Sequence, residues 1–151
     1  MFVKRLISSI VITILALVLT IAGGTILAAA LWVISIIGLS EFYRATGVHQ
    51  AEKKLNALEA VGYAGLTLYY FVMMCSSNAT LLLLVLITSL VGFMFVYVFT
   101  FPKHHAEKLM AAFFGLVYVP VMLSFIYLTR SLLYGSYIVW LIFISSWIND
   151  T

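Results

Sequence analysis

The residues best suited to chemistry stand together in the run Asn149-Asp150-Thr151. Asp150 is an ionisable residue at the tip of an apolar run, and such a residue facing a cavity is a candidate for function. A hard divalent cation such as Mg²⁺ takes carboxylate oxygens together with substrate phosphates, and Asn149 and Thr151 add polar neighbours. The alternative interpretation is that Asp150 only marks the end of the membrane span at the interface, as a stop signal. One carboxylate does not make a metal site, so further ligands are expected from sequence outside this chain.

A second charged group lies in the run "GLSEFYR", where Glu41 and Arg44 are three residues apart. This spacing places both side chains on one helix face and predicts an ion pair, with Phe42 and Tyr43 as anchors at the membrane interface. Two interpretations stay open. The group is either a cluster that marks the membrane boundary or a site at which Arg44 holds an anionic lipid headgroup.

Other candidate residues favour plain structural roles. Adjacent His104 and His105 point about 100° apart on a helix, so they make a poor pair of metal ligands. The only other histidine that could serve as a ligand, His49, is distant in the sequence. A basic loop near acidic lipid is therefore the better interpretation. The single Cys75 excludes an intramolecular disulfide and is expected to pack among its neighbours. The sequence has no glycine-rich phosphate loop, no Ser-His-Asp set and no His-Glu-x-x-His motif.

Composition indicates that a membrane surrounds the elements that position these residues. The 151-residue chain is 65% hydrophobic and 9% charged, with a mean hydropathy of +1.19, whereas about 25% charged residues are usual in soluble domains. The net charge of +3 is better explained by the enrichment of Lys and Arg on the cytoplasmic face than by nucleic acid binding. We therefore expect the lipid bilayer, and no nucleic acid, as a partner.

Charges and turn residues divide the chain into six apolar runs, each about as long as a membrane crossing. They are Leu6–Ala22, Thr25–Phe42, Ala60–Cys75, Ala79–Phe101, Leu109–Leu128 and Leu132–Ile148. The first two runs would be too long as one helix, so a reversal is expected at Gly23-Gly24, where backbone strain costs least. The sequence predicts an all-α, polytopic membrane protein of about six transmembrane helices.

The basic residues predict the orientation of these helices. Seven of the eight fall on one face, at positions 4, 5, 44, 53, 54, 103 and 108, and only Arg130 falls on the other. Because cytoplasmic loops are rich in Lys and Arg, the N-terminus is expected in the cytoplasm. An even number of crossings then places the C-terminus and Asp150 there too.

Two further features of the sequence are architectural. The segment Gly47–Glu59 repeats apolar residues at helical spacing and directs Glu59 away from them, which fits a short amphipathic helix on the cytoplasmic leaflet or a solvated connector. In the fifth run, Pro120 predicts a kink, and the Ala111-x-x-x-Gly115 spacing predicts close helix packing.

The closing run "VWLIFISSWINDT" resembles the phosphatidate cytidylyltransferase (CDP-diacylglycerol synthase) family, in which an apolar helix ends in Trp-x-Asn-Asp and continues into Gly-Ala-Tyr. The opening "VKRLISSIV" and the run "GLSEFYR" are similar to the family's first two spans. The family's distal signature, which closes with Asp-Arg-x-Asp, is absent. The chain, residues 1–151, is thus expected to be the amino-terminal membrane portion of such an enzyme, incomplete and inactive alone.

The resemblance implies an enzyme that transfers CMP from CTP to phosphatidic acid with Mg²⁺, giving CDP-diacylglycerol and pyrophosphate in phospholipid biosynthesis. It assigns Asp150 to catalysis and to metal and nucleotide binding, with Asn149 beside it on the nucleotide. A bacterial-type cell membrane and a possible homodimer are further expectations. Two alternatives stay open: a CTP-dependent polyprenol kinase and a non-catalytic membrane interaction protein.

Overall fold

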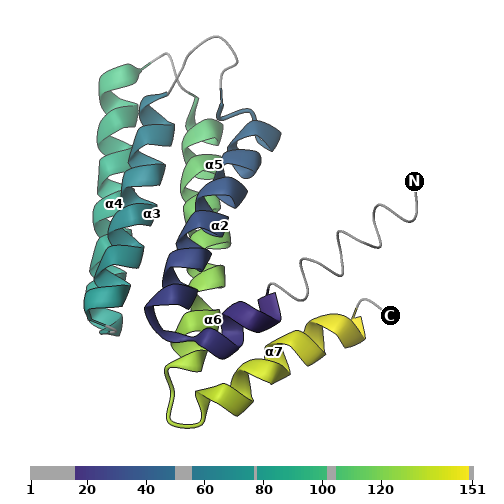
Figure 1. The fold of residues 1–151 in the computed structure, drawn as a ribbon. Coiled ribbons are helices and arrows are strands. Elements are labelled where there is room, and N and C mark those ends of the chain that lie inside the picture. Colours follow the sequence, from purple (N-terminus) through teal and green to yellow (C-terminus); the bar gives the residue numbers. More distant parts are fainter. Residues whose placement is uncertain (1–15, 50–55, 77, 102–104, 150–151) are drawn as a thin grey trace, which may run out of the picture. The chain divides into compact units, whose positions relative to one another are not determined.

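The computed structural model describes residues 16–49, 56–76, 78–101 and 105–149, the last without the side chains of Phe143, Ser146, Trp147 and Asn149 (Figure 1). Residues 16–22 are helical. The further elements are α2 (Gly24–Ala45), α3 (Ala57–Cys75), α4 (Ala79–Thr100), α5 (Ala106–Leu116), the π-helical segment η1 (Val117–Val121), α6 (Met122–Arg130) and α7 (Gly135–Asn149). No strand occurs in these residues, and the prediction of an all-α protein is confirmed.

Four stretches of helix are long and apolar enough to cross a membrane. They are Gly24–Ala45, Ala57–Cys75, Ala79–Thr100 and Ala106–Arg130, and they correspond to the second to fifth predicted runs. The 15-residue α7 would extend about 22 Å, which is short for a hydrocarbon core of about 30 Å. Most of the first run lies outside the described residues. The six-span count and the cytoplasmic position of both termini therefore stay predictions.

The chain forms two compact units, residues 31–125 and residues 1–30 with 126–151. In the first unit, α3 packs against α4 and α5. The ends of α2 and α4 and the starts of α3 and α5 lie at one end of this bundle, the upper end in Figure 1. The described helix ends that flank the two loops predicted to be cytoplasmic thus lie at the same end of the unit.

Small residues allow the helices of this unit to approach closely. A β-carbon on Gly62 of α3 would collide with the ring and hydroxyl of Tyr43 from α2, and one on Gly115 of α5 would stand 2.6 Å from the ring of Phe42. Association of apolar helices in lipid depends on such close packing, because no hydrophobic effect drives it there. The close packing predicted at Gly115 is confirmed.

Hydrogen bonds made by side chains join the spans within the core of this unit. The hydroxyls of Ser35 and Tyr70 lie 2.8 Å apart, and Tyr70 donates a 3.3 Å bond to the carbonyl oxygen of Pro120. The hydroxyls of Tyr69 and Ser124 lie 3.2 Å apart. Pro120 has no backbone N–H and sits inside the π-helical segment η1, where irregular backbone needs partners from neighbouring helices. Tyr70 supplies one.

The outer face of the same unit is apolar. Exposed large side chains on α4 include Leu83, Leu84, Val91, Phe95, Val98 and Phe99. An exposed apolar surface of this extent is unusual on a soluble protein and normal on one whose solvent is lipid.

In the second unit, Gly23 separates two helices at the place where the sequence predicts a reversal. Gly23 and Gly24 have φ of +62° and +54°, a conformation that glycine adopts without steric cost. Arg130, at the end of α6, donates a 3.1 Å hydrogen bond from Nε to the carbonyl oxygen of Thr20. Its guanidinium lies so near Gly23 that a β-carbon there would be 3.4 Å from it. The only basic residue predicted on the outer face thus caps the helix that ends before Gly23.

Candidate functional site

The predicted catalytic and metal-binding residue, Asp150, lies outside the described residues, as does Thr151. Asn149 is the last residue of α7, and its side chain is also outside the description. The roles assigned to Asp150 and Asn149 in binding nucleotide and metal therefore stay predictions.

The third predicted site residue, Arg44, lies in the last turn of α2. Its Nη1 is 3.5 Å from Oε1 of Glu41, and about two-thirds of each side chain is exposed (63% and 66%). The predicted ion pair is confirmed. A pair this exposed contributes little to stability. The same exposure leaves the Arg44 guanidinium accessible to a ligand. Its role in binding a lipid headgroup remains a prediction.

The two aromatic residues between them behave differently from the prediction. Tyr43 is buried, with 1% of its surface exposed, and its hydroxyl donates a 3.1 Å bond to the carbonyl oxygen of Ala112 in α5. Phe42 is half-buried and packs near Phe114 and Tyr118. The assignment of Tyr43 as an interfacial anchor is wrong, because glycine at position 62 leaves room for the ring inside the bundle.

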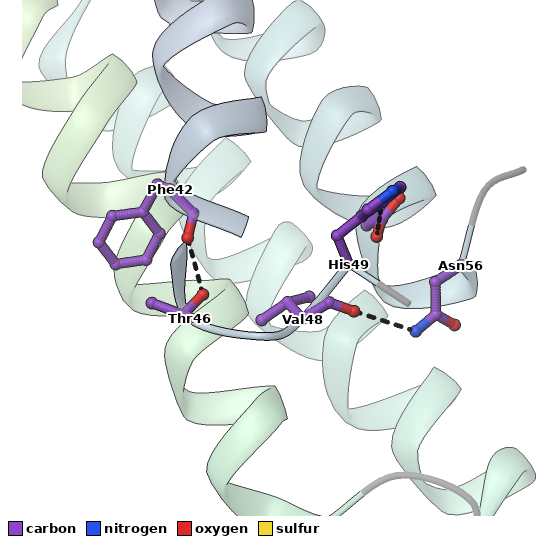
Figure 2. A network of polar contacts seen from close by, with 6 residues as sticks. Phe42, Thr46, Val48, His49 and Asn56 are labelled. Atoms are coloured by element: carbon purple, nitrogen blue, oxygen red, sulfur yellow. Dashed lines mark hydrogen bonds and ion pairs between the residues drawn. The ribbon is translucent and has the colours of Figure 1, made fainter. Parts of the chain in front are cut away.

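After α2 the chain turns back sharply (Figure 2). The hydroxyl of Thr46 donates a 2.8 Å bond to the carbonyl oxygen of Phe42, and the N–H of Gly47 bonds the carbonyl oxygen of Arg44. Gly47 has φ +68°, which suits a glycine that ends a helix. The N–H of His49 then donates a 3.0 Å bond to the carbonyl oxygen of Tyr43. The turn carries His49 back toward the start of α3.

There His49 meets a buried carboxylate. Nδ1 of His49 is 2.9 Å from Oε1 of Glu59, whose side chain is only 4% exposed, while 34% of the His49 side chain is exposed. Glu59 lies in the first turn of α3, where a negative charge is favoured by the helix dipole. A buried carboxylate needs a partner of this kind, since an unpaired charge in an apolar setting is costly.

This arrangement corrects the predicted direction of Glu59, while the choice between a short helix and a connector for Gly47–Glu59 stays open. Residues 47–49 form a turn and a bend, and a helix begins only at Ala57; residues 50–55 lie outside the described part. Glu59 is not directed to solvent but is buried. Sequence reasoning therefore missed the pair of His49 and Glu59. The one available signal was a carboxylate in a helix's first turn with a histidine ten residues before it.

Asn56, the residue before α3, supports the same turn. An Asn at this position usually accepts a hydrogen bond from the helix N-terminus, but the Asn56 side chain makes no such bond. Its Nδ2 points instead to the carbonyl oxygen of Val48, at 3.5 Å (Figure 2). Both polar side chains at the start of α3 thus hold the loop from α2, and His49 is held through its backbone and its ring.

A metal centre does not emerge from the described residues. They contain no group of three or more His, Cys, Asp or Glu side chains that could hold an ion; the predicted ligand Asp150 lies outside them, so the Mg²⁺ that the resemblance implies stays a prediction. His105 precedes α5 as its cap residue, and His104 lies outside the description. Cys75 is exposed at the end of α3, which corrects the expectation that it packs.

An apolar groove begins one helical turn after Glu59. It has a volume of about 530 Å³ and is lined by Tyr63, Ala64, Thr67, Leu68 and Phe71. These positions recur at helical spacing and lie on one face of α3. The ring of Tyr63 is 6.0 Å from that of Tyr43, the residue before Arg44. One end of the unit therefore combines an accessible guanidinium, a carboxylate-bound imidazole and the start of an apolar groove.

Comparison with known proteins finds one family. Residues 3–151 match the family model described as "Cytidylyltransferase family". No curated protein and no solved structure matches the chain.

Proposed function

The chain belongs to the cytidylyltransferase family, and on that premise we propose that it serves the transfer of CMP from CTP to phosphatidic acid. The products are CDP-diacylglycerol and pyrophosphate. The observation that carries the proposal is the family match over residues 3–151, which includes the closing Trp147-x-Asn149-Asp150 motif. Transfer of a nucleotide is the activity that the family supports, and phosphatidic acid is the finer part of the proposal.

The helices support a lipid as the acceptor. Four stretches of 19 to 25 residues are apolar enough to cross a membrane, and α4 exposes a largely apolar surface. An acceptor dissolved in the bilayer reaches such a protein by lateral diffusion, with its phosphate at the level where the helices end. CTP would approach from the cytoplasm, the side that we propose for Arg44 and Asp150 on the basis of the basic residues.

The reaction requires two phosphate-bearing substrates to meet at this level. A phosphate oxygen of the lipid attacks the α-phosphorus of CTP and forms a new P–O bond. The bond from that phosphorus to the oxygen bridging the α- and β-phosphates breaks, and pyrophosphate leaves with that oxygen and the electron pair. We assign the positioning of CTP to Asn149 and Asp150 and contact with the lipid headgroup to Arg44. Charge and orientation of this kind supply most of the catalysis in phosphoryl-type transfers.

Mg²⁺ remains a separate proposal, with Asp150 as its ligand. The proposed setting is a bacterial-type cell membrane, and a homodimer is a further possibility that an oligomeric-state measurement in detergent would test.

An acceptor assay tests the function directly. Membranes that contain the complete product of the gene encoding residues 1–151 are supplied with labelled CTP and either phosphatidic acid or a polyprenol. We expect labelled CDP-diacylglycerol with phosphatidic acid, and none from membranes lacking the gene in a host whose own enzyme is depleted. Phosphorylation of the polyprenol would support the lipid kinase instead. Absence of turnover with both acceptors would leave a non-catalytic membrane protein as the better explanation.

A further inference from the structure

We propose that His49, held by Glu59, binds the phosphate of the acceptor lipid together with Arg44, while an acyl chain of that lipid occupies the groove on α3. The inference rests on the proposed function and specifies where its membrane substrate binds. Contact of Arg44 with the headgroup is already part of the proposed function; the new elements are His49, Glu59 and the groove on α3, to which neither the family match nor the sequence assigns a role.

The first argument is the orientation of the His49 ring. Nδ1 is engaged at 2.9 Å by a carboxylate that is almost completely buried, so Nδ1 carries the hydrogen and donates it to Glu59. About a third of the side chain is exposed (34%), and Nε2, on the opposite edge of the ring from the bound Nδ1, is the nitrogen that is left for a ligand. The carboxylate on Nδ1 fixes the orientation of the ring, and in the imidazolium form Nε2–H is the donor that is left for a ligand. A phosphate oxygen is a strong acceptor for such a group.

The second argument is the rigidity with which the ring is held. The N–H of His49 bonds the carbonyl oxygen of Tyr43, and Asn56 reaches the carbonyl oxygen of the preceding residue, Val48. Tyr43 is itself anchored to α5 through Ala112. A ligand-binding donor is most effective when it is ordered before the ligand arrives, because less conformational entropy is then lost on binding.

The third argument is that charge and apolar surface are continuous here. Arg44, in the last turn of α2, lies five residues before His49 and keeps most of its side chain exposed. Tyr63, whose ring is 6.0 Å from that of Tyr43, the residue before Arg44, also forms the start of the apolar groove that extends to Phe71. A molecule with an anionic head and an apolar tail matches this surface. CTP matches only the charged end of this surface.

The test uses two substitutions of His49 that separate its two nitrogens. In His49→Asn the side-chain amide replaces Nδ1 and keeps the contact with Glu59, but the Nε2 donor is lost. In His49→Gln the amide replaces Nε2, and the contact with Glu59 is lost. The complete gene product is assayed for the KM of phosphatidic acid, the KM of CTP and the thermal midpoint of unfolding.

For His49→Asn we expect the KM of phosphatidic acid to rise about tenfold, because one charge-assisted hydrogen bond is lost. The KM of CTP and the unfolding midpoint should not change. A lower unfolding midpoint for His49→Gln, with unchanged KM values in both variants, would show that the pair of His49 and Glu59 only stabilises the fold. A rise confined to the KM of CTP would assign His49 to the nucleotide and overturn the proposal.

The groove is tested with Ala64→Trp, which places an indole in it, and with Leu83→Trp on the exposed face of α4 as the matched control. Only the first should raise the KM of phosphatidic acid; equal effects would show that the groove holds no specific lipid.

A direct measurement of lipid binding tests this inference independently of the proposed reaction. The complete gene product in detergent is mixed with phosphatidic acid or phosphatidylcholine, and retained lipid is counted by native mass spectrometry. We expect phosphatidic acid to be retained preferentially, and His49→Asn to abolish the preference. This outcome without turnover would contradict the proposed function alone. Turnover with no preference, or with a preference that survives in His49→Asn, would contradict the lipid site alone.

Discussion

The hydroxyl of Tyr43, in the last turns of α2, donates a hydrogen bond of 3.1 Å to the carbonyl oxygen of Ala112 in α5. This bond joins two residues that are 69 positions apart in the sequence. It lies beside the turn that carries His49. The ring reaches α5 only because it passes over Gly62 of α3 at a distance that leaves no room for a β-carbon.

Substitution of that glycine tests the packing. Gly62→Ala should lower the free energy of unfolding in detergent by about 1–3 kcal/mol, the usual cost of an overpacked core. Gly92→Ala is the matched control, since its β-carbon would meet only Val61, at 3.3 Å. It should be close to neutral. Tyr43→Phe in the Gly62→Ala background should restore part of the loss by removing the hydroxyl. Equal stability of both alanine variants would contradict the packing at Gly62.

The bond from Tyr70 to the carbonyl oxygen of Pro120 predicts a smaller effect. Tyr70→Phe removes this bond and the contact with the Ser35 hydroxyl. Hydrogen bonds between membrane helices contribute about 0.6 kcal/mol on average and up to about 1.7, so we expect a loss within that range in a detergent unfolding titration. Tyr118→Phe, at an exposed position, should change nothing measurable. A loss as large in the control would show that the effect is not specific to the core.

Cys75 provides a native probe of orientation. It is the only cysteine of the chain and is exposed at the end of α3, which the basic residues predict to be the outer end. A membrane-impermeant maleimide should label it in intact cells. In a Cys75→Ser background, Thr46→Cys at the other end of the unit should be labelled only after permeabilisation. The reverse pattern would invert the orientation and remove the cytoplasmic position proposed for Arg44 and His49.

Asp150 is tested in the complete gene product. Asp150→Asn keeps the size and polarity of the side chain but removes its charge. If the carboxylate positions the phosphates of CTP, turnover should fall by about 10²-fold or more, ~2.7 kcal/mol of transition-state stabilisation. Glu107→Gln, an exposed carboxylate in the first turn of α5, should stay within a few-fold of the unchanged protein. Near-normal turnover of Asp150→Asn, with normal insertion, would reduce Asp150 to a stop signal.

Local rules account for the features that the sequence by itself determined. The break at Gly23, the ion pair of Glu41 and Arg44 and the apolar helices each depend on residues within a few positions of one another. Backbone freedom, helical periodicity and the thickness of a bilayer are enough to predict them. The family resemblance depended likewise on short runs such as "WIND", and the match over residues 3–151 confirms it.

Only the tertiary structure decided where the polar residues near the end of α2 point. Helical periodicity directed Glu59 to solvent and placed Tyr43 at the interface, and both assignments were wrong. The direction of each side chain depends on a partner from another element: the turn after α2 brings His49 to Glu59, and Gly62 makes room for Tyr43. A buried carboxylate is stable only if a partner reaches it, and spacing along the chain does not contain that information.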